Sequence, residues 1–260
     1  EIIGSKEFII RHHQQSIGKF RVGLFGEQNI SNAVAVVAFL HSNGFAPNNI
    51  SEALGKFKGV NRRQQELSCD HRYRIFDDYG HHPREIRATL AALNEQCSGR
   101  LLVAFQPHRY TRTKHLLGDF AQCFDGVDLL WITEVYAASE APIDNINGRR
   151  LAEAISESGQ PAAFAATLEI LRDKIRNALR PGDTILFLGA GDITQVAHQL
   201  AKDMHMKEMT HTTELRGLLS SQSTVLENEP LGRHTTLGVG GPAEIYIEPA
   251  EEKELAVVLR

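Results

Sequence analysis

Short apolar segments alternate with longer segments of helical pattern between residues 72 and 188, and this alternation constrains the fold more than any other feature of the chain. The apolar segments are RYRIF, LLVAF, DLLWIT, AAF and TILFLG, which begin at Arg72, Leu101, Asp128, Ala162 and Thr184. Helices are expected between them, after Pro83, from Thr111, near Leu151 and near Leu168. Strands separated by helices of about 10 to 15 residues are typical of βαβ units. We therefore predict an α/β fold with a mostly parallel sheet flanked by helices.

The residues before this region predict the tail of an earlier domain. Brief apolar clusters at residues 7–10 and 20–25 indicate short strands, and a long helical pattern runs from Asn29 to about Ser42. A second helix is expected from about Asn49 to Phe57, with a stop at Lys58 and Gly59. The chain does not start with Met, so we expect it to begin inside a larger gene product.

The alternation of strands and helices stops after about Met204. Residues 205–229 are rich in Ser, Thr and Glu, and we interpret them as a linker with a short helix around Glu214 to Leu219. Beyond them, a strand at Ile245 to Ile247 and a helix near Ala250 are expected. One strand and one helix bury too little surface for a core, so residues 230–260 are expected to be a segment cut short.

Composition and charge narrow the class of protein. With 42% hydrophobic residues the chain can fill a core, which excludes disorder for most of it. A formal net charge of -4 argues against a nucleic-acid or anionic-membrane partner. No run approaches the ~20 apolar residues that cross a bilayer, and the N-terminus lacks the features of a signal peptide. Cys69, Cys97 and Cys123 form no CxxC pair and fit a reduced, cytoplasmic compartment.

Two strand-end loops are rich in groups that ionise or form hydrogen bonds. DDYGHHP, at Asp77–Pro83, follows the first strand of the alternating region, and QPHRYTRT, at Gln106–Thr113, follows the second. Ligands bind at the carboxyl ends of parallel strands, so we expect both loops to face one crevice from neighbouring strands. Arg109 and Arg112 lie three apart and can grip a carboxylate or phosphate, beside His108. The alternative is a pair of solvated surface arginines.

The remaining polar motifs are less specific. His81 and His82 have no third ligand at a zinc spacing, so we predict no metal site, but a hydrogen-bonding role for one and a helix-entry role for the other. Asp78 is a candidate for a ribose diol, and Asp77 for a partner of the loop backbone. GVNRR, at Gly59–Arg63, is either a hinge with nucleotide contacts or a basic surface turn.

Two glycine patterns bear on phosphate binding. GAGD, at Gly189–Asp192, predicts a structural turn with Asp192 as a helix N-cap, because it lacks the third glycine of a dinucleotide fingerprint. No GxxxxGK[ST] loop occurs in the chain, so any cradle for ATP phosphates lies outside it.

Five motifs in order, GEQNISNA, FKGVNRR, FDDYGHHP, QPHRYTRT and FLGAGDI, resemble the Mur ligases, and specifically the UDP-N-acetylmuramate–L-alanine ligases. The resemblance covers about residues 1–204. It implies an ATP- and Mg²⁺-dependent enzyme of peptidoglycan synthesis, which forms an acyl phosphate that the amine of L-alanine attacks. It also implies that residues 1–58 end a central ATPase domain and that residues 59–204 form a Rossmann-like C-terminal domain.

The resemblance carries over to individual residues. Asn29 and Asn32 are expected near the adenine of ATP, and Arg63 and Asp78 at its ribose and phosphates. The residues expected to position L-alanine and the UDP-N-acetylmuramate are Tyr79, His81, His108, Arg109 and Arg112. Gln28 departs from the family, which usually has His there. No catalytic residue and no metal ligand are assigned within the chain.

The end of the chain resembles a different family. PLGRHTTLGVGGPAEIYIEPAEEKELAVVLR, from Pro230, is similar to the start of the UDP-N-acetylenolpyruvoylglucosamine reductases, which use FAD and NADPH. Gly238 stands where that family often has Arg. The resemblance implies a truncated α+β FAD-binding segment at residues 230–260, after a linker at 205–229. The whole gene product would then be a ligase fused to a reductase.

Two alternatives remain open. The first is a non-catalytic module that binds a nucleotide or an amino acid, which the missing phosphate loop favours. The second is another ligase of the same superfamily, such as one that recycles murein peptides, against which PHRYTRT argues. In the preferred interpretation the partners are L-alanine, the UDP-sugar, ATP and the missing upstream and downstream parts of the same polypeptide. The isolated chain is expected to be inactive.

Overall fold

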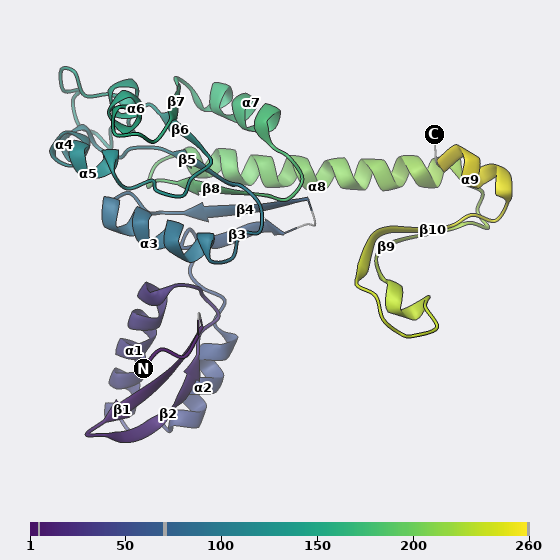
Figure 1. Ribbon diagram of the computed structural model, residues 1–260, viewed down its shortest axis with the longest axis horizontal. Coiled ribbons are helices and arrows are strands. Elements are labelled where there is room, and N and C mark those ends of the chain that lie inside the picture. The colour runs from purple at the N-terminus through teal and green to yellow at the C-terminus, as the bar shows by residue number, and fades with distance from the viewer. Residues whose placement is uncertain (5, 70–71, 259–260) are drawn as a thin grey trace. The chain divides into compact units, whose positions relative to one another are not determined.

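The computed structural model describes residues 1–4, 6–69 and 72–258 of the chain. They form two compact units, residues 1–198 and residues 199–260, which are described separately (Figure 1). The boundary falls inside the long helix α8, Ile193–Leu218. No helix in these described ranges is long and apolar enough to cross a membrane.

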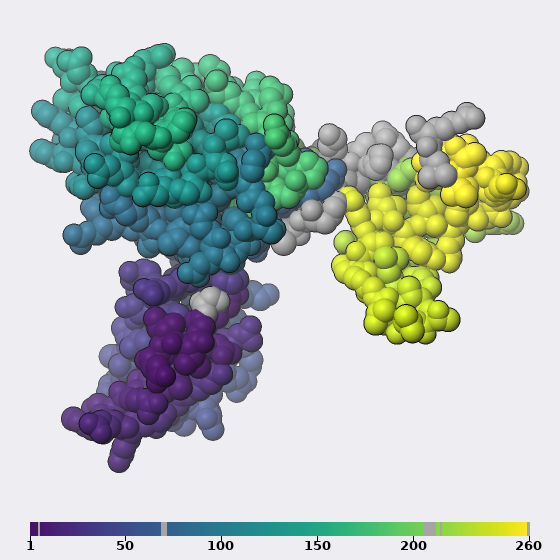
Figure 2. Space-filling model, in the orientation of Figure 1, coloured from purple at the N-terminus to yellow at the C-terminus, as the bar shows by residue number. Residues whose placement is uncertain are grey.

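The first unit starts with a hairpin covered by two helices. Its elements are β1 (Glu7–His12), β2 (Gln15–Arg21), α1 (Glu27–Ser42) and α2 (Pro47–Lys56). Phe8 and Phe20 face each other across the antiparallel pair, with ring centroids 5.8 Å apart. Together with Ile30, Val37 and Ile50 they form a core of their own, in the part of the chain that is purple in Figure 2. The predicted strand at residues 7–10 and the helix from Asn29 to Ser42 are confirmed.

A six-stranded sheet forms the rest of the first unit. Its strands, in sheet order, are β3 (Gln65–Cys69), β4 (Tyr73–Asp78), β8 (Asp183–Leu188), β5 (Leu101–Phe105), β6 (Leu129–Thr133) and β7 (Ala162–Ala165). Its helices are α3 (Pro83–Asn94), α4 (Tyr110–His115), α5 (Leu117–Ala121), α6 (Gly148–Glu157), α7 (Leu168–Ala178) and the start of α8. All strand pairs are parallel except β3 with β4, which confirms the predicted α/β fold with a mostly parallel sheet.

Both faces of the sheet are covered, which explains the apolar strand sequences. Every residue of β5 and β8 is buried. Val103 and Phe105 pack with residues of α3, α5 and α6, whereas Leu102 and Ala104 point to the other face because side chains alternate along a strand. Strands buried on both faces appear as continuous apolar runs, as LLVAF and TILFL do.

The strand order corrects one expectation about the site. β4 and β5, which precede the two polar loops, are not neighbours, because β8 lies between them. The loop after β8 carries GAGD and therefore lies between the two polar loops. Sequence periodicity identifies strands but does not give their lateral order.

The second unit differs from the predicted linker. Helix α8 continues to Leu218, and β9 (Thr224–Pro230) pairs with β10 (Pro242–Glu248) in an antiparallel hairpin. A short 3₁₀ turn, Leu231–Arg233, and α9 (Glu252–Val258) complete it. The expectation of a linker at 205–229 with a helix only around 214–219 was wrong in its local structure. The segment is polar, but it contains neither Pro nor Gly before Gly217, so nothing in it stops the helix.

Candidate functional site

The loop after β4 is fixed by the start of helix α3. His82 is the N-cap of α3, and its Nδ1 accepts a hydrogen bond from Arg84 N at 3.2 Å. Pro83 follows at the first helical position. Glu85 completes a capping box, because its Oε2 accepts hydrogen bonds from His82 N at 3.2 Å and His81 N at 3.0 Å. The predicted helix-entry role of one of the two histidines is therefore confirmed for His82.

Asp77 and Asp78 point to opposite faces of the sheet. Asp78 is buried, and its two oxygens accept hydrogen bonds from Gln64 N at 2.8 Å and Gly80 N at 2.6 Å. Burial raises the pKa of Asp78, against the lowering effect of these two hydrogen bonds. Asp77 instead accepts a hydrogen bond from Thr194 Oγ1 at 2.6 Å. The sequence interpretation that gave the backbone-binding role to Asp77 was wrong, and Asp78 has that role.

Four aromatic rings from three strand-end loops form a row, which we call the ring row. Tyr79 and His81 follow β4, His108 follows β5, and Tyr136 follows β6. The ring centroids are 5.3 Å apart for Tyr79 and His81, 5.5 Å for His81 and His108, and 5.7 Å for His108 and Tyr136. The two polar loops predicted to face one crevice are thus in contact through His81 and His108.

His108 is held as a neutral ring. Burial lowers its pKa, and the positive charges of His81, Arg112 and Arg109 lower it further, against the raising effect of Glu140. A neutral imidazole has one acceptor nitrogen, and Arg112 Nη1 donates to His108 Nδ1 at 3.2 Å. His108 therefore orients Arg112.

Arg109 has a different partner from Arg112. Arg109 lies at the N-cap of α4 with a positive φ of 69°, and its Nη1 is 4.0 Å from Glu140 Oε1. Glu140 also accepts hydrogen bonds from Thr111 N at 3.0 Å and Thr111 Oγ1 at 2.7 Å, so it fixes the start of α4. The two guanidinium groups therefore have different partners and are not joined in a single fork.

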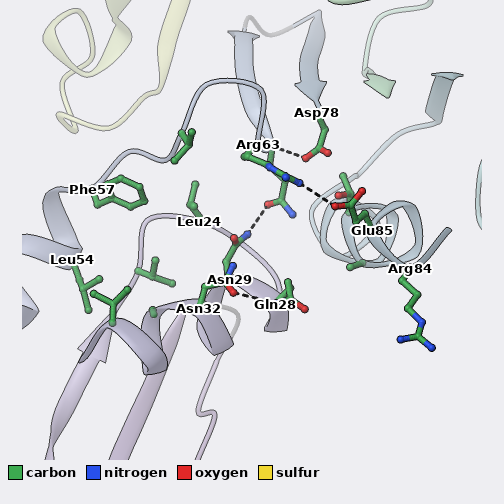
Figure 3. A pocket seen from close by; sticks show the side chains of 17 residues that line it. Leu24, Gln28, Asn29, Asn32, Leu54, Phe57, Arg63, Asp78, Arg84 and Glu85 are labelled. Carbon is green, nitrogen blue, oxygen red and sulfur yellow. Dashed lines mark hydrogen bonds and ion pairs between the residues drawn. The ribbon is translucent and has the colours of Figure 1, made fainter. Parts of the chain in front are cut away.

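A cavity of about 670 Å³ opens beside Asp78 and the start of α3 (Figure 3). The four residues expected at a nucleotide all line it: Asn29, Asn32, Arg63 and Asp78. Leu54 and Phe57 lie at its apolar end, and Arg63, Asp78 and Glu85 lie at the opposite, polar end (Figure 3). Its volume is in the range of small-molecule sites. An apolar end for a planar ring and a guanidinium for phosphate suit a nucleotide.

Hydrogen bonds orient the side-chain amides that line the cavity. Asn29 Nδ2 donates to Phe25 O at 2.7 Å and to Gln64 Oε1 at 3.3 Å. Gln28 Nε2 donates to Asn32 Oδ1 at 3.2 Å. Gln28, the residue that departs from the family pattern, therefore orients Asn32.

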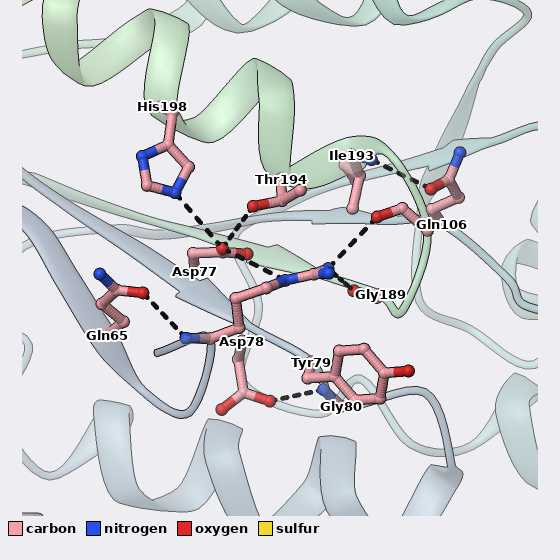
Figure 4. Close-up of polar contacts among 12 residues, drawn as sticks. Gln65, Asp77, Asp78, Tyr79, Gly80, Gln106, Gly189, Ile193, Thr194 and His198 are labelled. Atoms are coloured by element: carbon pink, nitrogen blue, oxygen red, sulfur yellow. Dashed lines mark hydrogen bonds and ion pairs between the residues drawn. The ribbon is translucent and has the colours of Figure 1, made fainter. Parts of the chain in front are cut away.

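Arg62 was not singled out from the sequence, yet it joins the ends of β4 and β8, where Asp77, Tyr79 and Gly189 lie (Figure 4). Its Nη2 donates to Gly189 O at 2.5 Å and Gly191 O at 3.3 Å, and its Nε is 3.5 Å from Asp77 Oδ2. Its guanidinium carbon lies 5.0 Å from the centre of the Tyr79 ring. Arg63 approaches the same ring, at 5.6 Å. GVNRR is therefore an anchored segment rather than a basic surface turn.

GAGD is a structural turn, as predicted. Gly189 has a φ of 148°, and a Cβ there would come within 2.9 Å of Gln106 O. A Cβ on Gly191 would come within 2.6 Å of the Tyr136 ring. Asp192 precedes α8, and its Oδ1 accepts a hydrogen bond from Gln106 Nε2 at 2.7 Å.

The described side chains form no candidate cluster of metal ligands. Among them, no group of three or more His, Cys, Asp or Glu is arranged to hold a metal ion. No step is assigned to the Mg²⁺ that the family resemblance implies.

The sequence interpretation missed several residues of the site: Gln64, Glu85, Tyr136 and Glu140. A signal existed for Glu85, which follows His82 by three residues in the spacing of a capping box. Tyr136 and Glu140 follow the strand DLLWIT, so the strand-end argument applied to two loops also selects this third one.

Comparison with known proteins shows the family of the chain. Residues 62–191 match the family described as Mur ligase, glutamate ligase domain. The UDP-N-acetylmuramate–L-alanine ligase of Brucella anthropi is 41% identical over 189 residues, which cover 72% of this chain and 40% of that protein. The crystal structure of the UDP-N-acetylmuramate-alanine ligase from Thermotoga maritima is similar with a TM-score of 0.62 at 30% identity, covering 73% of this chain and 40% of that one.

A more distant structure shows the fold alone. The murein peptide ligase from Psychrobacter arcticus has a TM-score of 0.55 at 20% identity, covering 78% of this chain and 43% of that one. The chain spans about two fifths of the length of the curated relatives it matches. The family match covers half of the 260 residues, and the chain therefore belongs to the Mur ligase family.

Proposed function

We propose that this chain is the part of an ATP-dependent UDP-N-acetylmuramate–L-alanine ligase that completes the nucleotide cavity and positions L-alanine. One observation carries the proposal. The loop Asp77–Pro83 contributes Asp78 to the cavity and Tyr79 and His81 to the ring row, so a nucleotide and an amino acid bound there would meet at one loop. The identity of 41% to a UDP-N-acetylmuramate–L-alanine ligase supports this substrate pair.

The proposed roles divide between the cavity, which binds the nucleotide, and the ring row, which positions the amino acid. Asn29 and Asn32 bind the adenine, and Arg63 and Asp78 contact the ribose and phosphates. ATP supplies the phosphoryl group that activates the carboxylate of the UDP-sugar, and the amine of L-alanine then displaces phosphate. The chain's own task is to hold the amino acid close to that carboxylate, which lowers the entropic part of the barrier.

L-alanine and the muramoyl end of the sugar nucleotide are assigned to the second group of residues. The residues proposed there are Tyr79, His81, His108, Arg109 and Arg112. An amino-acid carboxylate is recognised best by a guanidinium in a fixed orientation. Arg112, which donates to neutral His108, has such an orientation.

The domain organisation is part of the proposal. Residues 1–58 end a central ATPase domain, residues 59–204 form its C-terminal neighbour, and the phosphate loop and Mg²⁺ ligands belong to the rest of the polypeptide. The matched relatives are longer than the chain, which supports this. The 260-residue chain by itself is then expected to be inactive.

The experiment is an assay of the complete polypeptide with ATP, UDP-N-acetylmuramate and single amino acids. Phosphate release that requires L-alanine supports the proposal. Release with a murein peptide instead would favour the peptide-recycling ligase, and binding of ATP without any release would favour the non-catalytic module. Alanine-dependent phosphate release by the 260-residue chain alone would contradict the assignment of the phosphate loop to the rest of the polypeptide.

We further propose that residues 230–260 begin a reductase module that uses FAD and NADPH. Residues 199–260 form a separate unit that lies outside the matched range 62–191. Gly238 and Gly240, with φ of 63° and 152°, lie in the connection between β9 and β10. The complete polypeptide should then carry visible flavin absorption and oxidise NADPH with the enolpyruvyl UDP-sugar. A colourless protein without NADPH oxidation would contradict this second proposal.

A further inference from the structure

Glu85 contacts both halves of the site with different oxygens. It lies in the first turn of α3, and its Oε2 accepts hydrogen bonds from His81 N at 3.0 Å and His82 N at 3.2 Å. Its Oε1 lies 3.6 Å from Arg63 Nη1. One carboxylate therefore holds the backbone beneath a ring of the ring row and pairs with a cation of the nucleotide cavity.

Arg63 is placed to respond to a ligand. Its side chain lines the polar end of the cavity and is 49% exposed, so a phosphate can reach it (Figure 3). The same guanidinium lies 5.6 Å from the centre of the Tyr79 ring. A ligand that orders the Arg63 guanidinium therefore orders a group that contacts both Glu85 and the Tyr79 ring.

Glu85 is ionised under neutral conditions. Burial opposes its ionisation, but the hydrogen bond from His81 N, the charges of His81 and Arg63, and the hydrogen bond from His82 N together hold its pKa below the ordinary value. The interaction with Arg63 is therefore between two charges. An exposed ion pair contributes little by itself, so its order depends on what else binds Arg63.

We propose that Glu85 is a positioning residue that couples nucleotide binding at Arg63 to the placement of His81 in the ring row. The inference rests on the proposed function, which assigns a nucleotide to the cavity and an amino acid to the ring row. Binding of the nucleotide orders Arg63, the ordered Arg63 holds Glu85, and Glu85 holds the His81–His82 backbone. Because coupling between two sites is reciprocal, each ligand then tightens the binding of the other.

Two substitutions separate the contacts of Glu85. Glu85→Gln keeps a carbonyl oxygen for the backbone N–H groups but removes the charge that pairs with Arg63. Glu85→Ala removes both contacts and is expected to lower the melting temperature as well, because the capping box is lost. The matched control is Glu157→Gln on α6, which removes an ion pair with Arg150 at 3.2 Å and contacts neither half of the site.

The experiment measures the Kd of L-alanine in the complete polypeptide with UDP-N-acetylmuramate present, without and with a saturating non-hydrolysable ATP analogue. We expect the analogue to tighten L-alanine binding at least about fivefold in the unaltered protein and in Glu157→Gln. In Glu85→Gln the ratio of the two Kd values should fall to within about twofold of one. A purely structural role for Glu85 would leave this ratio unchanged.

The outcomes distinguish this inference from the proposed function. Full coupling in Glu85→Gln, or no coupling in the unaltered protein, overturns the role of Glu85 and leaves the proposed function standing. If the unaltered protein binds neither the analogue nor L-alanine, the proposed function fails and this inference fails with it.

Discussion

Arg112 Nη1 donates a hydrogen bond to His108 Nδ1 at 3.2 Å, so the residue proposed to bind the carboxylate of L-alanine is oriented by a histidine that must remain neutral. The ring of His108 is stacked on Tyr136, with an angle of 12° between the ring planes. Protonation of Nδ1 would replace this hydrogen bond by repulsion between two cations. The stability of the protein should therefore depend on pH through the protonation of His108.

The first prediction concerns stability below neutral pH. The pKa of His108 is lower in the folded chain than in the unfolded one, mainly through burial and then through His81 and Arg112, so the unfolded state binds more protons. The free energy of unfolding should then fall as the pH drops below the unfolded pKa of about 6.5 and towards the folded value. Urea unfolding at a series of pH values checks this. His108→Gln should reduce the slope between those two pKa values, and an unchanged slope would contradict the assignment.

The second prediction concerns Arg112 itself. In the complete polypeptide, Arg112→Ala should raise the KM for L-alanine or lower kcat by at least ~100-fold, as expected for the loss of a charged hydrogen bond to the substrate carboxylate. Steady-state kinetics with L-alanine as the varied substrate measures it. Arg150→Ala is a suitable control, because the Arg150 guanidinium pairs with Glu153 and Glu157 on the surface of α6. An unchanged dependence on L-alanine would remove Arg112 from the site.

The third prediction tests Arg62 as an anchor. Its guanidinium binds the GAGD turn and lies beside Asp77, which is fully buried. Arg62→Ala leaves that carboxylate without its cation and should lower the free energy of unfolding by about 2 to 4 kcal/mol. Arg63→Ala, one residue along, removes a half-exposed ion pair and an exposed contact with the Tyr79 ring, and should cost less than about 1 kcal/mol. Equal losses in urea unfolding would show that Arg62 does not anchor the segment.

Much of the sheet was predictable because its chemistry is local. LLVAF and TILFL are continuous apolar runs, which only strands covered on both faces require. The polar loops after RYRIF and LLVAF were predictable as a candidate site because parallel strands end at one edge. The strand β3, QELSC, was missed because an edge strand is only partly buried and keeps polar residues.

The remaining features of the site depend on side-chain orientation and strand order, which the sequence does not show. Asp77 and Asp78 have the same chemistry, and only the pleat of β4 decides that Asp77 faces Thr194 and Asp78 faces the loop. The position of β8 between β4 and β5 is set by packing of the whole sheet. The contacts of Arg62 follow from that order, because the GAGD turn after β8 lies within its reach.

The last prediction compares alanine substitutions at two glycines, of which Gly191 is closely packed and Gly55 is not. Gly191 lies against Tyr136, and a Cβ there would come within 2.6 Å of its ring, so Gly191→Ala must displace the end of the ring row. The free energy of unfolding should fall by about 1 to 3 kcal/mol, and the NMR resonances of the His108 ring should shift as its stacking on Tyr136 is lost. Gly55→Ala is the matched control, because no atom lies within 4 Å of its added Cβ and the residue is inside helix α2. That substitution should stabilise the chain by up to about 1 kcal/mol, since alanine favours the helix. If Gly191→Ala were tolerated as well as Gly55→Ala, the turn after β8 would not support Tyr136, and the ring row would depend on His81 and His108 alone.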